Sequence, residues 1–308
     1  MSRATREAYG ETLVELVREG HNIMAVDADL AGSTKLADFQ KAFPKRFVDV
    51  GIAEQDMVGV AAGLSLTGHT VFTGSFAMFA PGRAYDQIRN TVCDSGLNVK
   101  ICPTHAGITV GEDGATHQSL EDIGMMRALP QMRVLVPADY WSAKAALRLA
   151  AEADGPFYVR MGRHKVPEVY DETFKGGVPY ATVLREGTDV TLAACGVEVA
   201  QSLAAAEILA QEGISAEIID VFSIKPLDEE AILASAAKTR RVVSVEEHSV
   251  ATGLGAAVAQ LLSEKLPTPM RFAGMRTFGT SAPGDVLLSH FHLDAEGIAG
   301  RVREFVLA

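Results

Sequence analysis

The sequence has few cysteines and no block of basic residues. Only three cysteines occur in 308 residues, Cys93, Cys102 and Cys195, and no two of them have CxxC spacing. A disulfide framework and a metal site are therefore not expected, and we predict buried free thiols in a reducing compartment. Asp and Glu outnumber Lys and Arg by 39 to 28, which gives a net charge of −11. Because nucleic acid and anionic membranes attract basic surfaces, neither is an expected partner.

The chain also lacks a long apolar run. No stretch of 18 apolar residues predicts a membrane span, and the first residues lack the apolar core of a signal peptide. We therefore expect a cytoplasmic protein. Hydrophobic residues make up 48% and charged residues 22% of the sequence, as is typical of a globular protein. A chain of 308 residues is long enough for two domains.

The sequence contains a regular alternation of two periods. Short apolar runs alternate with amphipathic stretches of helical period, which is typical of βα units on a mainly parallel sheet. In the first half of the chain, strands are expected at 22–26, 70–74, 98–102, 133–137 and 156–160. Helices are expected there at 5–18, 36–43, 54–66, 82–93, 120–129 and 139–151.

A polar segment at 162–181, with proline, glycine and no clear period, interrupts this alternation. We predict a first domain over 1–165, a linker over 166–181 and a second domain over 182–308. The second domain has expected strands at 189–195, 215–221, 241–247 and 270–274, and expected helices at 197–212, 227–238, 253–265 and 294–306. The predicted fold class is α/β, with two domains that each hold a mainly parallel sheet flanked by helices.

Polar side chains gather in the loops that follow the strands of the first domain, where ligands bind in open α/β sheets. Asp29 in such a loop could simply cap a turn, and Arg163 could simply belong to a solvated hinge. A metal site at two histidines of one loop is not favoured, because that loop offers no further Cys or His. Nearly every strand-end loop nevertheless carries polar groups and glycines, which together favour an active site. The candidate residues are Asp29, Ser33, Phe76, Phe79, His105, Asp113, His117 and Arg163.

Glu54 opens a stretch of helical period built largely of Gly, Ala and Val, GIAEQDMVGVAAGLS at 51–65. One interpretation is an acid in a first helical turn, which the helix dipole favours. The other is a buried acid that serves a ligand. The stretch alone leaves both open.

Several motifs together resemble the C-terminal half of transketolases. The loop GEDGATHQ (111–118) closely matches the G-E-D-G-P-T-H-Q loop of that family, and ADL-x-x-S (28–33) and RALP (127–130) match as well. The likeness covers essentially the whole chain. The sequences GIAEQ (51–55) and RAYDQ (83–87) are more similar to the version in 1-deoxyxylulose-5-phosphate synthases.

The resemblance implies thiamine diphosphate as the cofactor, whose chemistry the protein positions. Glu54 would hydrogen-bond N1′ of the aminopyrimidine ring and share a proton with it. Phe79, with Phe76 nearby, would pack on the pyrimidine face, and Asp29 would lie near the thiazolium ring.

The resemblance also implies contacts to a sugar phosphate, for which cations and hydroxyl groups are suited. Asp113 and His117 would meet sugar hydroxyls near the reacting carbon, and His117 would be catalytic together with Glu54. The implied phosphate ligands are Arg6, Ser33, His105 and Arg163.

Part of the family's site is missing from this sequence. No G-D-G motif is followed by Asn, the pair that holds Mg²⁺ on the cofactor diphosphate in the superfamily. The resemblance therefore implies a partner, an N-terminal diphosphate-binding subunit that holds most of the Mg²⁺ site, in an α₂β₂ tetramer. The sequence departs from the usual transketolase pattern at three places: Ala53 stands in place of Arg, Gly82 in place of an aromatic residue, and HAG (105–107) in place of HDS. These departures bear on which sugar is the substrate.

Three functions remain open. The first is the C-terminal subunit of a split transketolase, which transfers a two-carbon ketol unit between sugar phosphates. The second is the β subunit of another thiamine-diphosphate enzyme, similar to 1-deoxyxylulose-5-phosphate synthase or to 2-oxoacid dehydrogenases. The third is a non-catalytic partner protein. The second domain carries no catalytic motif, and its glycine-rich stretch EEHSVATGLGAA (246–257) predicts helix–strand packing.

Overall fold

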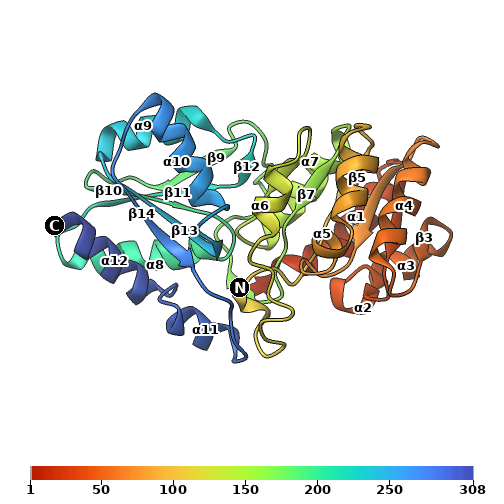
Figure 1. The fold of residues 1–308 in the computed structure, drawn as a ribbon, viewed down its shortest axis with the longest axis horizontal. Helices are drawn as coiled ribbons and strands as arrows, with labels where there is room; N and C mark the ends of the chain where they lie inside the picture. The colour runs from red at the N-terminus through yellow and green to blue at the C-terminus, as the bar shows by residue number, and fades with distance from the viewer. Residues whose placement is uncertain (1, 308) are drawn as a thin grey trace.

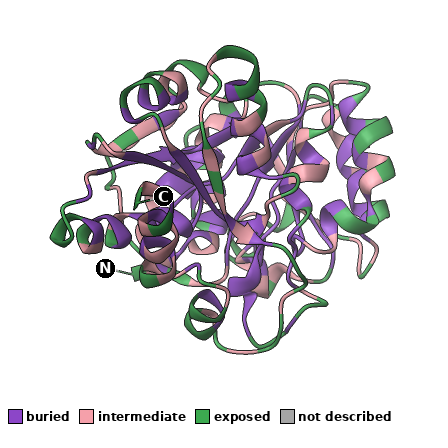
Figure 2. Cartoon of the chain, turned by 60° about the vertical axis from the view of Figure 1, so that its left-hand side comes forward, coloured by how far each residue is buried: buried purple, intermediate pink, exposed green. Residues whose placement is uncertain are grey.

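Two α/β domains lie side by side in the computed structural model, which describes residues 2–307 (Figure 1). The first half of the chain, coloured red to green, forms the domain on the right, and most of the second half forms the domain on the left. Buried residues follow the strands of both domains, and exposed residues lie on the outer helices (Figure 2). The predicted two-domain α/β fold is confirmed.

The sheet of the first domain has seven strands in the order β12-β6-β7-β5-β4-β2-β3. Neighbouring strands are parallel throughout, except that β12 is antiparallel to β6. The parallel strands bring their carboxyl ends to one edge, where the loops after β2, β4, β5 and β7 meet. The strands are β2 (Ile23–Asp27), β3 (Phe47–Asp49), β4 (Thr70–Gly74), β5 (Val99–Ile101), β6 (Arg133–Leu135), β7 (Phe157–Val159) and β12 (Ser223–Lys225).

Amphipathic helices cover this sheet. In α1 (Ala8–Arg18), Tyr9, Leu13 and Leu16 recur at helical spacing and are fully buried. The helix α7 (Tyr140–Glu152) begins at a capping box, in which the Asp139 side chain accepts from Ser142 N. The other helical segments are η1 (Thr5–Glu7), α2 (Ala31–Thr34), α3 (Ala37–Ala42), η2 (Pro44–Arg46), α4 (Glu54–Ser65), α5 (Ala80–Arg83), η3 (Gln87–Cys93), η4 (Ile108–Val110) and α6 (Asp122–Arg127).

The second sheet has five strands in the order β14-β13-β10-β11-β9, parallel except for the antiparallel edge strand β9. A separate pair, β1 (Ser2–Ala4) and β8 (Lys165–Pro167), is antiparallel. The strands of the second sheet are β9 (Ala181–Arg185), β10 (Val190–Ala194), β11 (Ala216–Val221), β13 (Val242–Ser249) and β14 (Met270–Met275). Its helices are α8 (Glu198–Gln211), α9 (Glu229–Thr239), α10 (Leu254–Lys265), α11 (Gly284–His290) and α12 (Ala295–Leu307).

Several short elements differ from the sequence expectation. The strands β1, β3, β8 and β12 have three residues each, which is too short to show a period of two. The helix expected at 82–93 is wrong as a single helix, because the chain forms α5 and then the π-helix η3.

The strand β12 ties the two halves of the chain together. It lies in the C-terminal half of the sequence, yet it pairs with β6 of the first sheet, and Lys225 Nζ donates to the carbonyl oxygen of Arg127 at 3.0 Å. Apolar side chains near β6, such as Val134 and Val136, belong to one core cluster with Ile219 and Val221 of β11. The predicted boundaries at 165 and 181 stay a prediction.

Candidate functional site

The loops at the carboxyl edge of the first sheet are held against one another. Phe76 and Thr104 form a parallel bridge just beyond the ends of β4 and β5. Ala106 N donates to Met161 O after β7, at 3.2 Å. The loop 104–118 is therefore fixed between the segments that follow the neighbouring strands.

Glu54 is the first residue of α4 and is only 4% exposed. Its Oε1 accepts from Arg83 Nη1 at 2.8 Å. The Arg83 guanidinium also lies over the ring of Phe79, with Cζ at 4.2 Å from the ring centroid. A flat cation with N–H donors thus contacts both a buried carboxylate and an aromatic face.

Four aromatic rings pack together next to Glu54 and Arg83. The rings of Phe76 and His105 are stacked with centroids 3.8 Å apart. Phe76 and Phe79 are stacked at 5.8 Å, and His117 meets Phe79 edge-on at 5.3 Å. The sequence separates these residues by up to 41 positions, and the fold brings all four into contact.

His105 is buried and has a left-handed backbone, with φ of 61°. Its Nε2 lies 3.1 Å from Arg6 Nη1, and its Nδ1 lies 2.7 Å from Thr104 Oγ1. Arginine can only donate, so we assign Nε2 as the acceptor and Nδ1–H as the donor. Burial, followed by the charges of Arg6 and Arg163, lowers the pKa of His105 to about 3. The imidazole is therefore neutral near pH 7.

Arg6 and Arg163 form a cationic region beside His105. Arg6 Nη1 donates to Ser33 O at 2.9 Å, so the main chain of Ser33 lies at this site. Burial and the charge of Arg163 lower the pKa of Arg6. Among the described residues, no group accepts from the buried Arg6 Nε. A half-buried guanidinium with an unused Nε donor suits an anion.

Arg163 connects the cationic region to the loop that carries Asp113. Its Nη1 donates to Val110 O at 3.0 Å and lies 3.3 Å from Asp113 Oδ2. The side chains of Arg163 and Asp113 are 37% and 41% exposed. These polar groups are open to a ligand from solvent.

Asp29 is set apart from the other candidates. It is exposed, has φ of 62°, and donates its N–H to Asp49 Oδ1 at 3.2 Å. Within residues 2–307, no hydrogen bond or ion pair joins its carboxylate to the other candidates. The neighbouring Asp27 is buried instead and accepts from Leu30 N at 2.6 Å, and burial raises its pKa to about 7.

Two residues at or beside the site were missed by the sequence analysis. Arg83 lies within the motif RAYDQ. This motif contributed to the family resemblance, and it did not predict the contact of Arg83 with Glu54. Glu247 comes from β13 of the second domain, and its Oε2 accepts from Thr109 in the middle of the loop 104–118. A local pattern carries no signal for a contact between residues 138 positions apart.

Neither a cluster of metal ligands nor a membrane-spanning helix is found within residues 2–307. No group of three or more His, Cys, Asp or Glu side chains within residues 2–307 could hold a metal ion. In the same part of the chain, no helix combines the length and the apolar character needed to span a membrane. All three cysteines are buried free thiols.

Two family models cover most of the chain. Residues 1–168 match the transketolase pyrimidine-binding domain, and residues 179–298 match the transketolase C-terminal domain. The chain belongs to the transketolase family. The order of the two matched domains is the order of the two domains in Figure 1.

Individual relatives match along nearly their whole length. A protein of Methanocaldococcus jannaschii described as a transketolase C-terminal section is 49% identical over 311 residues, which cover 98% of this chain and 96% of the relative. A 6-deoxy-6-sulfo-D-fructose transketolase subunit of Clostridium sp. is 42% identical and covers 97% of this chain and 93% of its own length. Among solved structures, a split gene transketolase described as an inactive β4 tetramer is similar, with a TM-score of 0.91 and 48% identity over 99% of this chain and 98% of that one. This chain is thus similar to transketolase C-terminal sections.

Proposed function

We propose that this protein is the C-terminal subunit of a split transketolase, which transfers a two-carbon ketol unit between sugar phosphates with thiamine diphosphate. The observation that carries the proposal is the group formed by Glu54, Arg83 and Phe79. There a flat group with N–H donors lies over an aromatic ring and bonds a buried carboxylate. An aminopyrimidine ring is also flat and presents nitrogen atoms at its edge, so these residues fit that part of the cofactor.

Thiamine diphosphate, when bound, supplies the nucleophilic carbon on which the ketol unit is carried. The proposed role of this chain is to hold the pyrimidine ring and to exchange protons with that ring and with the sugar. Glu54 would share a proton with N1′ of the pyrimidine, and its burial at the start of α4 would keep water from that contact. Phe79 supports the ring face, and Asp29 is proposed near the thiazolium. His117, in contact with Phe79, is proposed to exchange a proton with the sugar hydroxyl at the reacting carbon.

The cationic region is the proposed anion subsite. Arg6 has an unused buried donor, and Arg163 lies close enough for its charge to lower the pKa of Arg6. Neutral His105 and the Ser33 segment complete the subsite, and Asp113 lies at its rim for sugar hydroxyls. The relative from Clostridium is named for a sulfonated sugar, which supports an anion at the far end of the sugar as the common substrate feature.

The diphosphate half of the cofactor site is proposed to come from a partner subunit that carries the Mg²⁺ ligands. The names of the relatives, a C-terminal section and a subunit, support this division. The exposed face of α4 is a proposed part of the contact. Gly59 and Gly63 are open to solvent there, and Ile52 and Leu66 at the two ends are 76% and 74% exposed. Two copies of each subunit would close about a two-fold axis.

The test is reconstitution. This chain and a candidate diphosphate-binding partner are assayed apart and mixed, with thiamine diphosphate and Mg²⁺, for ketol transfer and for cofactor binding by calorimetry. We expect turnover and tight binding only in the mixture. Tight binding and turnover by the isolated chain would overturn the split-subunit proposal, and a mixture that binds the cofactor but transfers no ketol unit would point to another thiamine-diphosphate reaction.

A further inference from the structure

The second domain contacts the loop 104–118, here called the substrate loop, through one buried carboxylate. Glu247, at the carboxyl end of β13, is 3% exposed. Its Oε2 accepts from Thr109 N at 3.1 Å and from Thr109 Oγ1 at 2.8 Å. Thr109 lies between His105 and Asp113 in the loop 104–118, so both donors of this residue are held by the other domain.

The loop lies directly on this carboxylate. Gly107 has φ of +79°, and a Cβ added there would lie 2.1 Å from Glu247 Cδ. Any side chain at this position would displace either the loop or Glu247. Gly107 is two residues from His105, and its N–H donates to Ser119 O at 3.0 Å. A shift of Glu247 would therefore move Gly107 and, with it, the main chain near His105.

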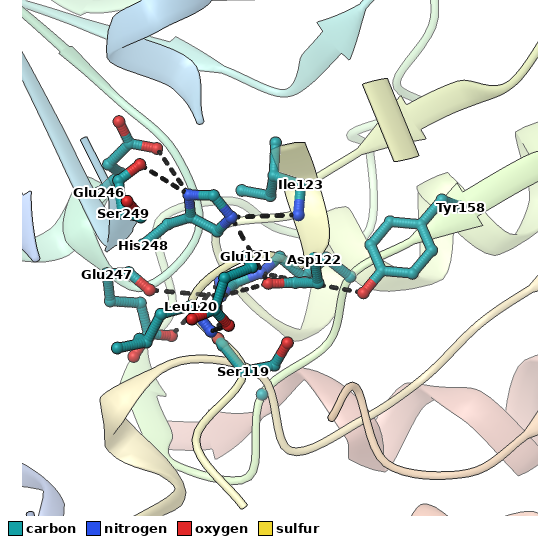
Figure 3. A network of polar contacts seen from close by, with 12 residues as sticks. Ser119, Leu120, Glu121, Asp122, Ile123, Tyr158, Glu246, Glu247, His248 and Ser249 are labelled. Atoms are coloured by element: carbon teal, nitrogen blue, oxygen red, sulfur yellow. Dashed lines mark hydrogen bonds and ion pairs between the residues drawn. The ribbon is translucent and has the colours of Figure 1, made fainter. Parts of the chain in front are cut away.

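Arg160 completes the contact from the first domain. Its Nη2 donates to Glu247 O at 3.2 Å and to Ser119 O at 3.3 Å, and its Nη1 lies 3.7 Å from Glu247 Oε1. Burial raises the pKa of Glu247, and Arg160 and the donors of Thr109 act against that shift. Figure 3 shows Glu247 and His248 pointing toward the segment 119–123, where His248 Nε2 accepts from Ile123 N at 3.1 Å.

A second contact braces the far end of the same loop. Gln118 Nε2 donates to Thr280 O at 2.9 Å, and Ser281 Oγ donates to Glu112 O at 2.6 Å. His164 Nε2 lies 3.1 Å from Asp285 Oδ1. The segment 280–285 of the second domain therefore flanks Asp113 from outside.

From these contacts we infer that the C-terminal domain positions the substrate loop, with Glu247 as the positioning residue. The inference rests on the proposed function for the loop's substrate. It assigns a role in sugar binding to a domain that carries no catalytic motif. Glu247 acts through Thr109 and Gly107 on His105 and Asp113, and it touches neither Glu54 nor Phe79. Sugar binding and cofactor binding should therefore respond differently to its removal.

Glu246 provides a matched control. It is the adjacent residue of β13 and is also buried, but its carboxylate accepts from Leu254 N and Gly255 N within its own domain, at 2.7 and 2.8 Å. The variants are E247A, which removes the acceptor of Thr109, E247Q, which keeps one oxygen for Thr109, and E246A, which removes the acceptor of Leu254 and Gly255. Each is measured in the complex reconstituted with the partner subunit.

We expect E247A to raise the KM for the phosphorylated sugar on the order of 10- to 100-fold, because a loop displaced by about 1 Å misplaces its ligands. The Kd for thiamine diphosphate should change less than about twofold. E247Q should recover most of the sugar KM. E246A should lower the melting temperature without changing the ratio of the two constants. Equal changes in both constants for E247A, or the same sugar defect in E246A, would overturn the inference.

Hydrogen exchange on the full chain tests the positioning without any assay of turnover. E247A should speed exchange at Gly107 and Thr109, while amides of α4 exchange as in the unchanged protein. Unchanged exchange across the loop would overturn the inference. If the unchanged complex transfers no ketol unit, the proposed function fails, and this exchange measurement still decides whether Glu247 holds the loop.

Discussion

Arg83 Nη1 lies 2.8 Å from Glu54 Oε1, while the same guanidinium covers the ring of Phe79. Both contacts are ones that the proposed pyrimidine ring would make. If the cofactor binds as proposed, Arg83 would compete with it for Glu54 and Phe79 and would have to move.

Replacing Arg83 with Met tests this competition. The variant keeps an apolar side chain and removes the charge. Because Arg83 is 49% exposed, its ion pair is worth only about 0.2–1 kcal/mol, so the apparent Kd for thiamine diphosphate should fall about 1.4- to fivefold. Calorimetry on the reconstituted complex measures it. Arg89→Met is the control, since the Arg89 side chain is exposed and, among the described residues, hydrogen-bonds only its neighbour Asn90. Weaker binding in Arg83→Met would mean that Arg83 is itself a cofactor ligand.

Glu54→Gln addresses the proposed proton transfer. Glutamine has the size of glutamate and can still hydrogen-bond, but it cannot share a proton as an acid. Ketol transfer should fall about 10²- to 10⁴-fold, the usual contribution of general acid–base catalysis, with the melting temperature within a few degrees of the unchanged protein. Initial rates of the reconstituted complex are the measurement. Turnover near the normal rate would contradict the assignment of Glu54 to N1′.

Arg6→Ala and Arg163→Ala test the anion subsite. Loss of a hydrogen bond to a charged group costs about 1.5–3 kcal/mol, so the KM for a phosphorylated sugar should rise roughly 10- to 100-fold. The KM for hydroxypyruvate, a donor without phosphate, should change far less. Arg303→Ala is the control, because Arg303 pairs with Glu212 on the surface of the second domain. An equal loss for both donors would indicate a structural role for the arginines.

The low pKa of His105 predicts a pH-dependent stability difference. The folded-state pKa is about 3, and the unfolded value is near 6.5, so the unfolded chain binds the extra proton between these values. His105 therefore costs stability as the pH falls below about 6.5, by roughly 1.4 kcal/mol per pH unit. Relative to His105→Gln, the unchanged protein should lose about 2 kcal/mol between pH 7 and pH 5. Urea unfolding of both proteins at the two pH values measures this difference, and a constant difference would show that folding does not lower the pKa of His105.

The grouping of the four aromatic rings of the candidate site could be predicted from sequence, because it depends on strand order. Phe76, Phe79, His105 and His117 follow β4 and β5, and parallel strands bring their loops to one edge. The contacts among these four rings follow from that topology. The motif GEDGATHQ (111–118) identified the loop of the first domain that also contacts the second domain.

Other features depend on side-chain packing between distant elements. The contact of Arg83 with Glu54 requires α5 and the start of α4 to lie together, and neither segment encodes the other's position. Glu247 appeared in a stretch expected only to pack a helix on a strand. Asp29 was predicted beside the cofactor, and the structure gives it an exposed, left-handed turn conformation.

The position of strand β12 in the sequence has a consequence for folding during synthesis on the ribosome. The chain emerges from its N-terminus, and domains usually begin to fold in that order. Until Lys225 has been synthesised, β6 is an open edge with unpaired main-chain groups, the kind of edge at which strands from other chains can add. The first sheet is therefore completed by a segment that is synthesised only after β11 of the second sheet.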